Sequence, residues 1–370
     1  MPTPIIQFGT SRFLQAHADL FVSDAMAEGQ AVGPITVVQT SGAADRAGRL
    51  AAFDGRPIPI VIRGLENGKP VERTEYTRSI ARGLSAAGDW AEIERVFVEE
   101  AEQAISNTGD SGYQMPDGEA LGDGLPVSFP GKLTKLLAAR WRKGAKPLTL
   151  FPCELISANG AALRGLCEAI ARRSGLPEGF VAWLNEDCVF ANSLVDRIVS
   201  EALEPAGAVA EPYALWAIER RAGLVVPLAH KAIRVVDDLK ITERLKLLIL
   251  NLGHTCLAER WLKEARRRDE TVREMLDMAD MRGFLDALYD EEVLPVFAAA
   301  GIGEAPAYRL SVLERFRNPF LRHRLADIAT NHAVKKQRRI GGLRALAAEV
   351  APDMRLPRLT AIQESGFAGL

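Results

Sequence analysis

The spacing of hydrophobic and polar positions predicts alternating strands and helices over the first two thirds of the chain, and mainly helices after about residue 240. The opening segment PIIQF is an apolar strand pattern, and the turn Gly9-Thr10-Ser11 follows it. A second apolar strand, ITVVQ, spans residues 35–39. Between them, apolar positions recur near the helical period at Phe13, Ala16, Leu20, Phe21 and Ala25. This order predicts the first βαβ unit of a nucleotide-binding sheet, with phosphates at the helix N-terminus.

The same patterns predict further elements along the chain. Two strand segments meet at Asn67-Gly68, a dipeptide that favours a tight hairpin turn. Pro130 suits the first turn of a helix, where its missing N–H does little harm, and Asn159 is a candidate helix cap. The predicted elements are a hairpin over 58–76, helices over 89–100, 129–141 and 159–173, and strands over 102–107 and 148–152.

These patterns predict an α/β fold in two domains, which is also the default for a chain of this length. We expect a Rossmann-like doubly wound sheet over residues 1–230. Few β-branched runs occur after about residue 240, so we expect a mostly α-helical domain over 231–370.

Three polar residues stand out in the helical part because they interrupt the apolar run LKLLILNLGHT. On a regular helix, Lys246, Asn251 and His254 would project within an arc of about 140°, with a rise of about 12 Å from the lysine to the histidine. Either the lysine reaches over a turn, or the segment bends near Gly253. Because solvating all three would expose the apolar run, we expect a polar ligand to bind there.

The chemistry of this trio fits the interconversion of a secondary alcohol and a ketone. A lysine shielded from water favours its neutral form, so Lys246 can take a proton from a hydroxyl or return it to a carbonyl. The amide of Asn251 can donate to the reacting oxygen without adding net charge. His254 can position the same oxygen or its neighbour, with a role that depends on its tautomer. We therefore expect these three residues to be catalytic.

The bulk composition narrows the class of protein. A net charge of −2 with 25% charged residues gives no reason to expect nucleic acid or a membrane as a partner. The basic runs at 266–268 and 335–339 are interpreted as solvated faces. The cysteines and histidines lack metal-ligand spacing, so we expect no metal, and the N-terminus lacks a signal-peptide pattern. We expect a soluble, reduced, cytoplasmic protein, and the sequence leaves the oligomeric state open.

Several segments together resemble the long-chain polyol dehydrogenase family, which includes mannitol 2-dehydrogenase and the tagaturonate and fructuronate reductases. They occur in the family's order, and the Lys-x4-Asn-x2-His spacing matches its catalytic signature. The segments are FGTSRFLQAH, SNTGDSGY, SFPGKLTKLL, CELISANG, FANSLVDRI, AEPYALW, KLLILNLGHT and RFRNPFLRH. The resemblance implies an NAD-binding N-terminal domain, a helical substrate domain, and a cleft between them in which Lys246 is the general acid/base.

The same resemblance implies further site residues. For the cofactor these are Gly9, Thr10, Ser11, Phe13, Asn107 and Thr108. For the substrate they are Glu154, Arg315 and Asn318. An arginine fork would suit a substrate carboxylate, whereas the alternative for Arg315 and Asn318 is a helix-end cap with a surface ion pair.

The chain departs from the family pattern at two places near the cofactor. Ser11 stands where members usually carry glycine, and Gly109-Asp110 where Thr-Glu is common. The second strand ends without an acidic residue for the ribose, so Asp45 could serve from a distance, or Arg46 could meet a 2′-phosphate. We expect NAD, with NADP as the alternative.

The sequence predicts an NAD(P)-dependent, metal-independent oxidoreductase acting on a sugar acid or polyol. The segment Cys153-Glu154-Leu155, together with RFRNPFLRH, favours a sugar-acid ketone such as tagaturonate or fructuronate. A non-catalytic dinucleotide sensor on the same fold is the alternative, and the reduced glycine turn is its best support. A metal-dependent hydrolase is a distant third hypothesis, and we expect activity to survive a chelator.

Overall fold

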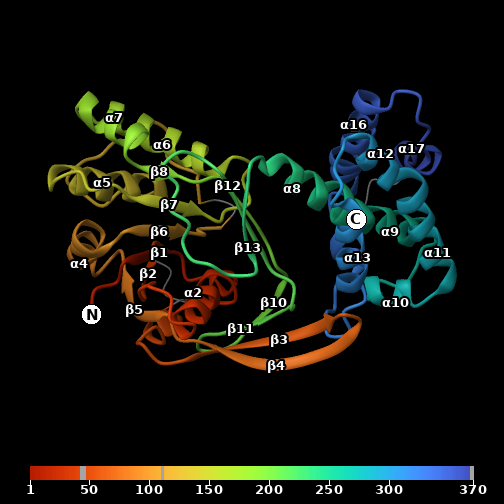
Figure 1. The fold of residues 1–370 in the computed structure, drawn as a ribbon, viewed down its shortest axis with the longest axis horizontal. Helices are drawn as coiled ribbons and strands as arrows, with labels where there is room; N and C mark the ends of the chain where they lie inside the picture. Colours follow the sequence, from red (N-terminus) through yellow and green to blue (C-terminus); the bar gives the residue numbers. More distant parts are fainter. Residues whose placement is uncertain (42–46, 110–111, 367–370) are drawn as a thin grey trace. The chain divides into compact units, whose positions relative to one another are not determined.

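The structure is a computed structural model that describes residues 1–41, 47–109 and 112–366 of the chain (Figure 1). Contacts divide it into two compact units. The first comprises residues 1–62 and 73–239, and the second comprises 63–72 and 240–370. Asp45, Arg46 and Asp110, which were considered above, lie outside the described residues.

The first unit is built on a six-stranded sheet in the order β5-β2-β1-β6-β7-β8, and every neighbouring pair in it is parallel. The chain passes from β1 to one side through β2 and β5, then returns to the other side of β1 with β6. This is the doubly wound pattern that the sequence predicted, and the prediction of an α/β fold is confirmed. The strands are β1 (Ile5–Phe8), β2 (Ile35–Gln39), β5 (Ile80–Ser85), β6 (Gln103–Ser106), β7 (Thr149–Pro152) and β8 (Val189–Phe190).

Successive residues of the sheet face opposite cores, as the two-residue period of a strand requires. Ile6 and Phe8 join the core formed with α5, α6 and α7, whereas Ile5 and Ile105 join the core formed with α2 on the other face (Figure 1). Helices therefore cover both faces, as a parallel sheet needs. The helices of this unit are α1 (Arg12–Gln15), α2 (Ala18–Ala27), α3 (Ala47–Ala51), α4 (Trp90–Arg95), π-helical η2 (Val96–Glu100), α5 (Phe129–Arg142), α6 (Asn159–Arg173) and α7 (Glu178–Glu186).

The predicted hairpin is confirmed as β3 (Ile58–Glu66) and β4 (Lys69–Thr77). Its turn residues Asn67 and Gly68 both have positive φ, 53° and 72°, as a type I′ turn requires. The tip of this hairpin belongs to the second compact unit. Two smaller sheets have the orders β10-β11-β3-β4 and β13-β12-β9, with β9 (Ser193–Asp196), β10 (Val199–Ala202), β11 (Ala208–Ala210), β12 (Leu215–Glu219) and β13 (Ile233–Val236).

Two local expectations were wrong. The single helix expected after β1 is broken at Ala16-His17, because the buried ring of His17 bonds the Leu215 carbonyl (3.1 Å) and the Arg197 guanidinium donates to the Ala16 carbonyl. Asn159 does not cap its helix, since Ala158 occupies the N-cap position. The Asn159 amide instead donates to the carbonyls of Pro152, Glu154 and Ser193.

The second unit is helical, as predicted, and has one continuous apolar core. Its longest run is a helix without interruption from Leu239 to Lys263, in which a π-helical turn separates two α-helical parts. Its elements are α8 (Leu239–Leu245), η3 (Lys246–Asn251), α9 (Leu252–Lys263), α10 (Val272–Leu276), α11 (Ala279–Leu288), η4 (Tyr289–Val293), α12 (Leu294–Ala299), α13 (Ala305–Phe316), α14 (Leu325–Ala329), α15 (His332–Lys336), η5 (Gln337–Gly341), α16 (Gly342–Val350) and α17 (Pro357–Glu364).

Candidate active site

The switch point of the main sheet lies between β1 and β6, where the connections run in opposite directions. Phe8 and Ser106 are in register at the carboxyl ends of these strands. The next residues are Gly9 and Asn107, and the Asn107 N–H donates to the Phe8 carbonyl (3.0 Å). Ligands of doubly wound sheets bind at such a point. The structure therefore brings the predicted cofactor segments 9–11 and 107–108 together.

The turn after β1 needs glycine at one position only. Gly9 has φ +119°, and a Cβ atom there would lie 2.3 Å from the Asn107 carbonyl oxygen. Ser11 instead has an ordinary extended backbone (φ −67°, ψ 146°) and its hydroxyl accepts the Leu14 N–H (3.2 Å), which caps α1. The serine that replaces the family glycine therefore leaves the turn unstrained, and binding of a dinucleotide phosphate at this turn stays a prediction.

The other predicted residues of this turn face inward. Thr10 is buried, and its carbonyl accepts the Gln15 amide (3.3 Å). Phe13 is half-buried and stacks on His17, with ring centroids 4.8 Å apart. The Thr10 carbonyl and the Phe13 ring thus help to hold the turn, and contact of these two residues with a cofactor stays a prediction.

Asn107 and Thr108 are held by a network that ends at Glu154. The Asn107 amide donates to the Cys153 carbonyl (2.7 Å), and its side-chain oxygen accepts the Ser11 hydroxyl (3.3 Å). Glu154 Oε1 accepts both the N–H and the hydroxyl of Thr108, each at 3.0 Å. The buried carboxylate thus positions the Thr108 segment.

The second oxygen of Glu154 is also occupied, by the hydroxyls of Ser106 (3.0 Å) and Tyr113 (3.3 Å). Burial raises the pKa of this carboxyl, and the donated hydrogen bonds act in the opposite direction. This arrangement favours a role in shaping the cofactor segment. Direct substrate binding by Glu154 stays a prediction.

Lys246 and Asn251 are the first and last residues of the π-helical turn η3. A π-helix bonds residue i to residue i+5, so residues five apart lie on consecutive turns. In an α-helix the same two residues would project about 140° apart. The departure from a regular helix that the sequence suggested is therefore this wider π-helical turn. It does not lie at Gly253, which is part of the regular helix α9. Single π-turns often occur at functional sites.

His254 lies in the first turn of α9 and is 6% exposed. Its ring packs on Phe316 (centroids 4.2 Å apart) and meets the His323 ring edge-on at 4.6 Å. Burial first, and then nearby cationic groups including Arg339 and Arg315, lower the pKa of His254 well below its ordinary 6.5. The imidazole is therefore neutral at physiological pH and can donate from one nitrogen and accept at the other.

Arg315 and Asn318 are both buried at the end of α13. The Asn318 amide donates to the Arg63 carbonyl in the hairpin tip (3.4 Å), and its oxygen accepts the Phe320 N–H (3.0 Å). Asn318 thus fixes the chain after α13, as a local cap would. Arg315 contributes positive potential at His254. Substrate contacts of both residues stay predictions.

The basic run at 335–339 was misinterpreted as a solvated face. Lys336 is buried, and its ammonium donates to the Ser365 hydroxyl (2.8 Å). Arg339 is half-buried and donates to the Asn251 carbonyl (3.1 Å) and the Thr255 hydroxyl (2.9 Å). Burial lowers the pKa of Arg339 to about 10. Sequence spacing carries no signal for this contact, because it depends on how distant helices pack.

Comparison with known proteins agrees with this geometry. The mannitol dehydrogenase Rossmann domain matches residues 4–225, and the mannitol dehydrogenase C-terminal domain matches 238–366. The chain belongs to the mannitol dehydrogenase family. The resemblance seen in the sequence is confirmed.

Relatives in this family include the altronate oxidoreductases of Klebsiella pneumoniae and Bacillus subtilis. Each is 33% identical to the chain; the first match covers 97% of the chain and 78% of the relative, and the second covers 89% and 72%. A substrate-free D-sorbitol dehydrogenase shares the fold, with a TM-score of 0.84 and 21% identity; the match covers 98% of the chain and 80% of the dehydrogenase. Pseudomonas fluorescens mannitol 2-dehydrogenase in complex with NAD and D-mannitol also shares the fold, with a TM-score of 0.73 and 17% identity. This match covers 98% of the chain and 78% of the mannitol 2-dehydrogenase.

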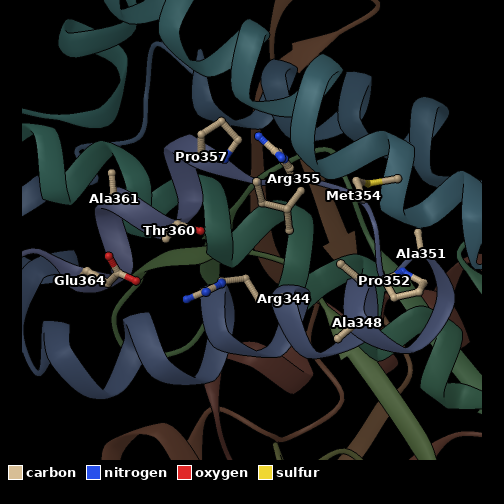
Figure 2. A pocket seen from close by; sticks show the side chains of 12 residues that line it. Arg344, Ala348, Ala351, Pro352, Met354, Arg355, Pro357, Thr360, Ala361 and Glu364 are labelled. Atoms are coloured by element: carbon tan, nitrogen blue, oxygen red, sulfur yellow. The ribbon is translucent and has the colours of Figure 1, made fainter.

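This member of the mannitol dehydrogenase family also has a cavity of about 590 Å³ lined by α16 and α17 (Figure 2). Arg344, Arg355 and Glu364 line it, and the predicted site residues are not among its lining. In the described part of the chain, no cluster of His, Cys, Asp or Glu could hold a metal, and no helix is long and apolar enough to span a membrane. The four cysteines are buried free thiols.

Proposed function

We propose that the chain is an NAD(H)-dependent oxidoreductase that interconverts a secondary alcohol and a ketone on a sugar acid. The observation that carries the proposal is the π-turn η3, which begins at Lys246 and ends at Asn251, with the buried, neutral His254 following it. Membership of the family and the 33% identity to altronate oxidoreductases support the reaction class and favour a sugar acid over a polyol.

The residues that would hold the dinucleotide are Gly9 to Ser11 and Asn107 to Thr108, at the switch point. When bound, the nicotinamide supplies the redox chemistry by accepting or returning a hydride. The protein's task is to bind the two reactants and move one proton.

Lys246 moves that proton. In the oxidative direction its neutral amine takes the hydroxyl proton as the carbon loses hydride, and in the reductive direction the ammonium returns a proton to the carbonyl oxygen. The Asn251 amide donates to this oxygen and stabilises its alkoxide character. His254 hydrogen-bonds the same or the adjacent oxygen. Because its imidazole is neutral, it adds no charge that would compete with Lys246.

The cationic surroundings of His254 support an acidic substrate. Arg315, Arg339 and Lys335 all contribute positive potential there. A guanidinium can bind a carboxylate through two parallel hydrogen bonds, so we assign Arg315 to the carboxylate of the substrate.

The test is a panel of aldonates, their keto acids and neutral polyols, assayed with NADH, NAD, NADPH and NADP by the absorbance of the reduced nicotinamide. The proposal expects turnover with sugar acids, weaker turnover with polyols, preference for NAD(H), and no effect of a chelator. A protein that binds NADH but turns over no member of the panel would contradict the proposal. The sensor alternative loses its support, because Ser11 keeps an ordinary backbone.

A further inference from the structure

Tyr289 lies against the helix that carries the proposed catalytic residues. It is fully buried, and its hydroxyl donates to the Ile249 carbonyl, inside the π-turn, at 2.9 Å. In a regular α-helix this carbonyl would bond the N–H of Gly253. A side chain inserted at such a carbonyl is one of the few causes of a local change in helix geometry.

Gly253 provides the space for this hydroxyl. A Cβ atom at Gly253 would lie 2.0 Å from Tyr289 Oη and 3.1 Å from Tyr289 Cζ. A close approach of this kind excludes every residue except glycine unless the tyrosine moves. Gly253 therefore does not bend the helix, and its function is to admit Tyr289.

The C-terminal end of the turn is bonded by one side chain from η5 and one from α9. The Asn251 carbonyl accepts Arg339 Nη1 (3.1 Å) and the hydroxyl of Thr255 (3.0 Å). Side chains thus bond two carbonyls of η3. The Ile249 carbonyl also accepts the N–H of Leu252, three residues on, rather than only the residue four on that an α-helix would use.

We propose that Tyr289 is a positioning residue that holds the π-turn and thereby sets the direction of Lys246 relative to Asn251. The inference rests on the proposed function, in which both side chains act on one substrate oxygen. If the turn relaxed to α-helix, the two residues would move from consecutive turns to directions about 140° apart. They could then no longer converge on the same atom.

The first test is Tyr289→Phe, which removes the hydroxyl and keeps the ring. We expect kcat to fall at least about tenfold, because small misplacements of catalytic groups are costly, while the Kd for NADH is unchanged. We also expect the pH profile of kcat to shift, and amide exchange in residues 246–254 to change. Tyr76→Phe, at a tyrosine that is 48% exposed, is the matched control and should keep wild-type values.

A purely structural role would lower Tm but leave kcat and its pH profile at wild-type values, and this result would overturn the proposal. A fall in kcat without a change in exchange at 246–254 would overturn it as well. If the wild type turns over no substrate, the proposed function fails. The exchange measurement and the double-variant comparison below still test the π-turn.

The second test compares Gly253→Ala in two backgrounds. In the wild type the new methyl group meets the hydroxyl at 2.0 Å, whereas in Tyr289→Phe the nearest ring atom is Cζ at 3.1 Å. We expect Gly253→Ala to lower Tm more in the wild type than in Tyr289→Phe, since the two sites are directly coupled. Equal losses in the two backgrounds would contradict the contact on which the proposal depends.

Discussion

Gly9 and Asn107 approach so closely that a Cβ atom on the glycine would lie 2.3 Å from the asparagine's carbonyl oxygen. The contact joins the ends of β1 and β6, the two strands that flank the switch point. The two segments of the proposed dinucleotide site therefore meet at a backbone contact that only glycine allows.

Gly9→Ala should disrupt this contact. The change combines a backbone clash with strain at φ +119°, so we expect a loss of roughly 2–6 kcal/mol in the free energy of unfolding and loss of NADH binding. Gly29→Ala is the control, because φ there is +77° but no atom lies within 4 Å of the added Cβ. It should cost only about 1–2 kcal/mol, with NADH binding retained. Urea unfolding and NADH titration measure both effects, and equal losses would contradict the argument.

Variants of Glu154 can show whether this residue holds the Thr108 segment by hydrogen bonds or binds the substrate through its charge. In Glu154→Gln the amide can still accept from Thr108, and the hydroxyls of Ser106 and Tyr113 can accept from its NH₂ group. We expect this variant to keep its KM for substrate and its Kd for NADH. Glu154→Ala should raise the Kd and cost roughly 1–3 kcal/mol for each buried donor left unpaired.

The opposite pattern would support direct substrate binding by Glu154. Glu154→Gln would then raise KM for an acidic or polyol substrate, while stability and NADH affinity would remain at wild-type values. Steady-state kinetics and thermal unfolding of the two variants distinguish these outcomes.

Asp19 is a fully buried carboxyl beside Gln7, and burial raises its pKa from 3.8 to about 7. Between these values the folded state keeps a proton that the unfolded state has lost, so Asp19 makes stability fall as pH rises from 3.8 to 7. His17 acts in the opposite sense, because burial lowers its pKa from 6.5 to about 3 and stability falls as pH drops through that window.

Asp19→Asn removes the first of these effects. Relative to the wild type, the variant should gain about 1.4 kcal/mol of stability per pH unit between pH 3.8 and 7. Asp117→Asn, in an exposed loop, removes the same charge and should give a curve parallel to the wild type. Urea midpoints measured across this pH range provide the comparison. A parallel curve for Asp19→Asn would show that Asp19 does not retain its proton.

The sequence predicted those parts of the fold that depend on local patterns. The strand–turn–helix start, the hairpin at Asn67-Gly68 and the helical second unit each follow from periodicity or from a turn dipeptide. The candidate residues Lys246, Asn251 and His254 were found because three polar side chains interrupt an apolar run. Gly9 and Asn107 were assigned to one cofactor site only by the resemblance to the family.

The features that sequence analysis missed depend on contacts distant along the chain. The helix break at His17 depends on the Leu215 carbonyl, 198 residues away. The π-turn at Lys246 is bonded by Tyr289 and Arg339, which no spacing within LKLLILNLGHT indicates. The sequence therefore left two alternatives, an ideal helix or a bend near Gly253, and the structure has a π-helical turn before Gly253 instead.

The central claim is that Lys246 transfers the proton in the reaction. Lys246→Ala should lower kcat by about 10²–10⁴ at neutral pH, as expected for the loss of a general acid/base, with the Kd for NADH unchanged. Lys263→Ala, at an exposed lysine in α9 of the same helical run, should keep wild-type kcat. The most direct measurement is turnover of a keto sugar acid with NADH by these two variants beside the wild type. Loss of turnover in Lys246→Ala alone is the predicted result, and wild-type turnover in that variant would contradict the mechanism.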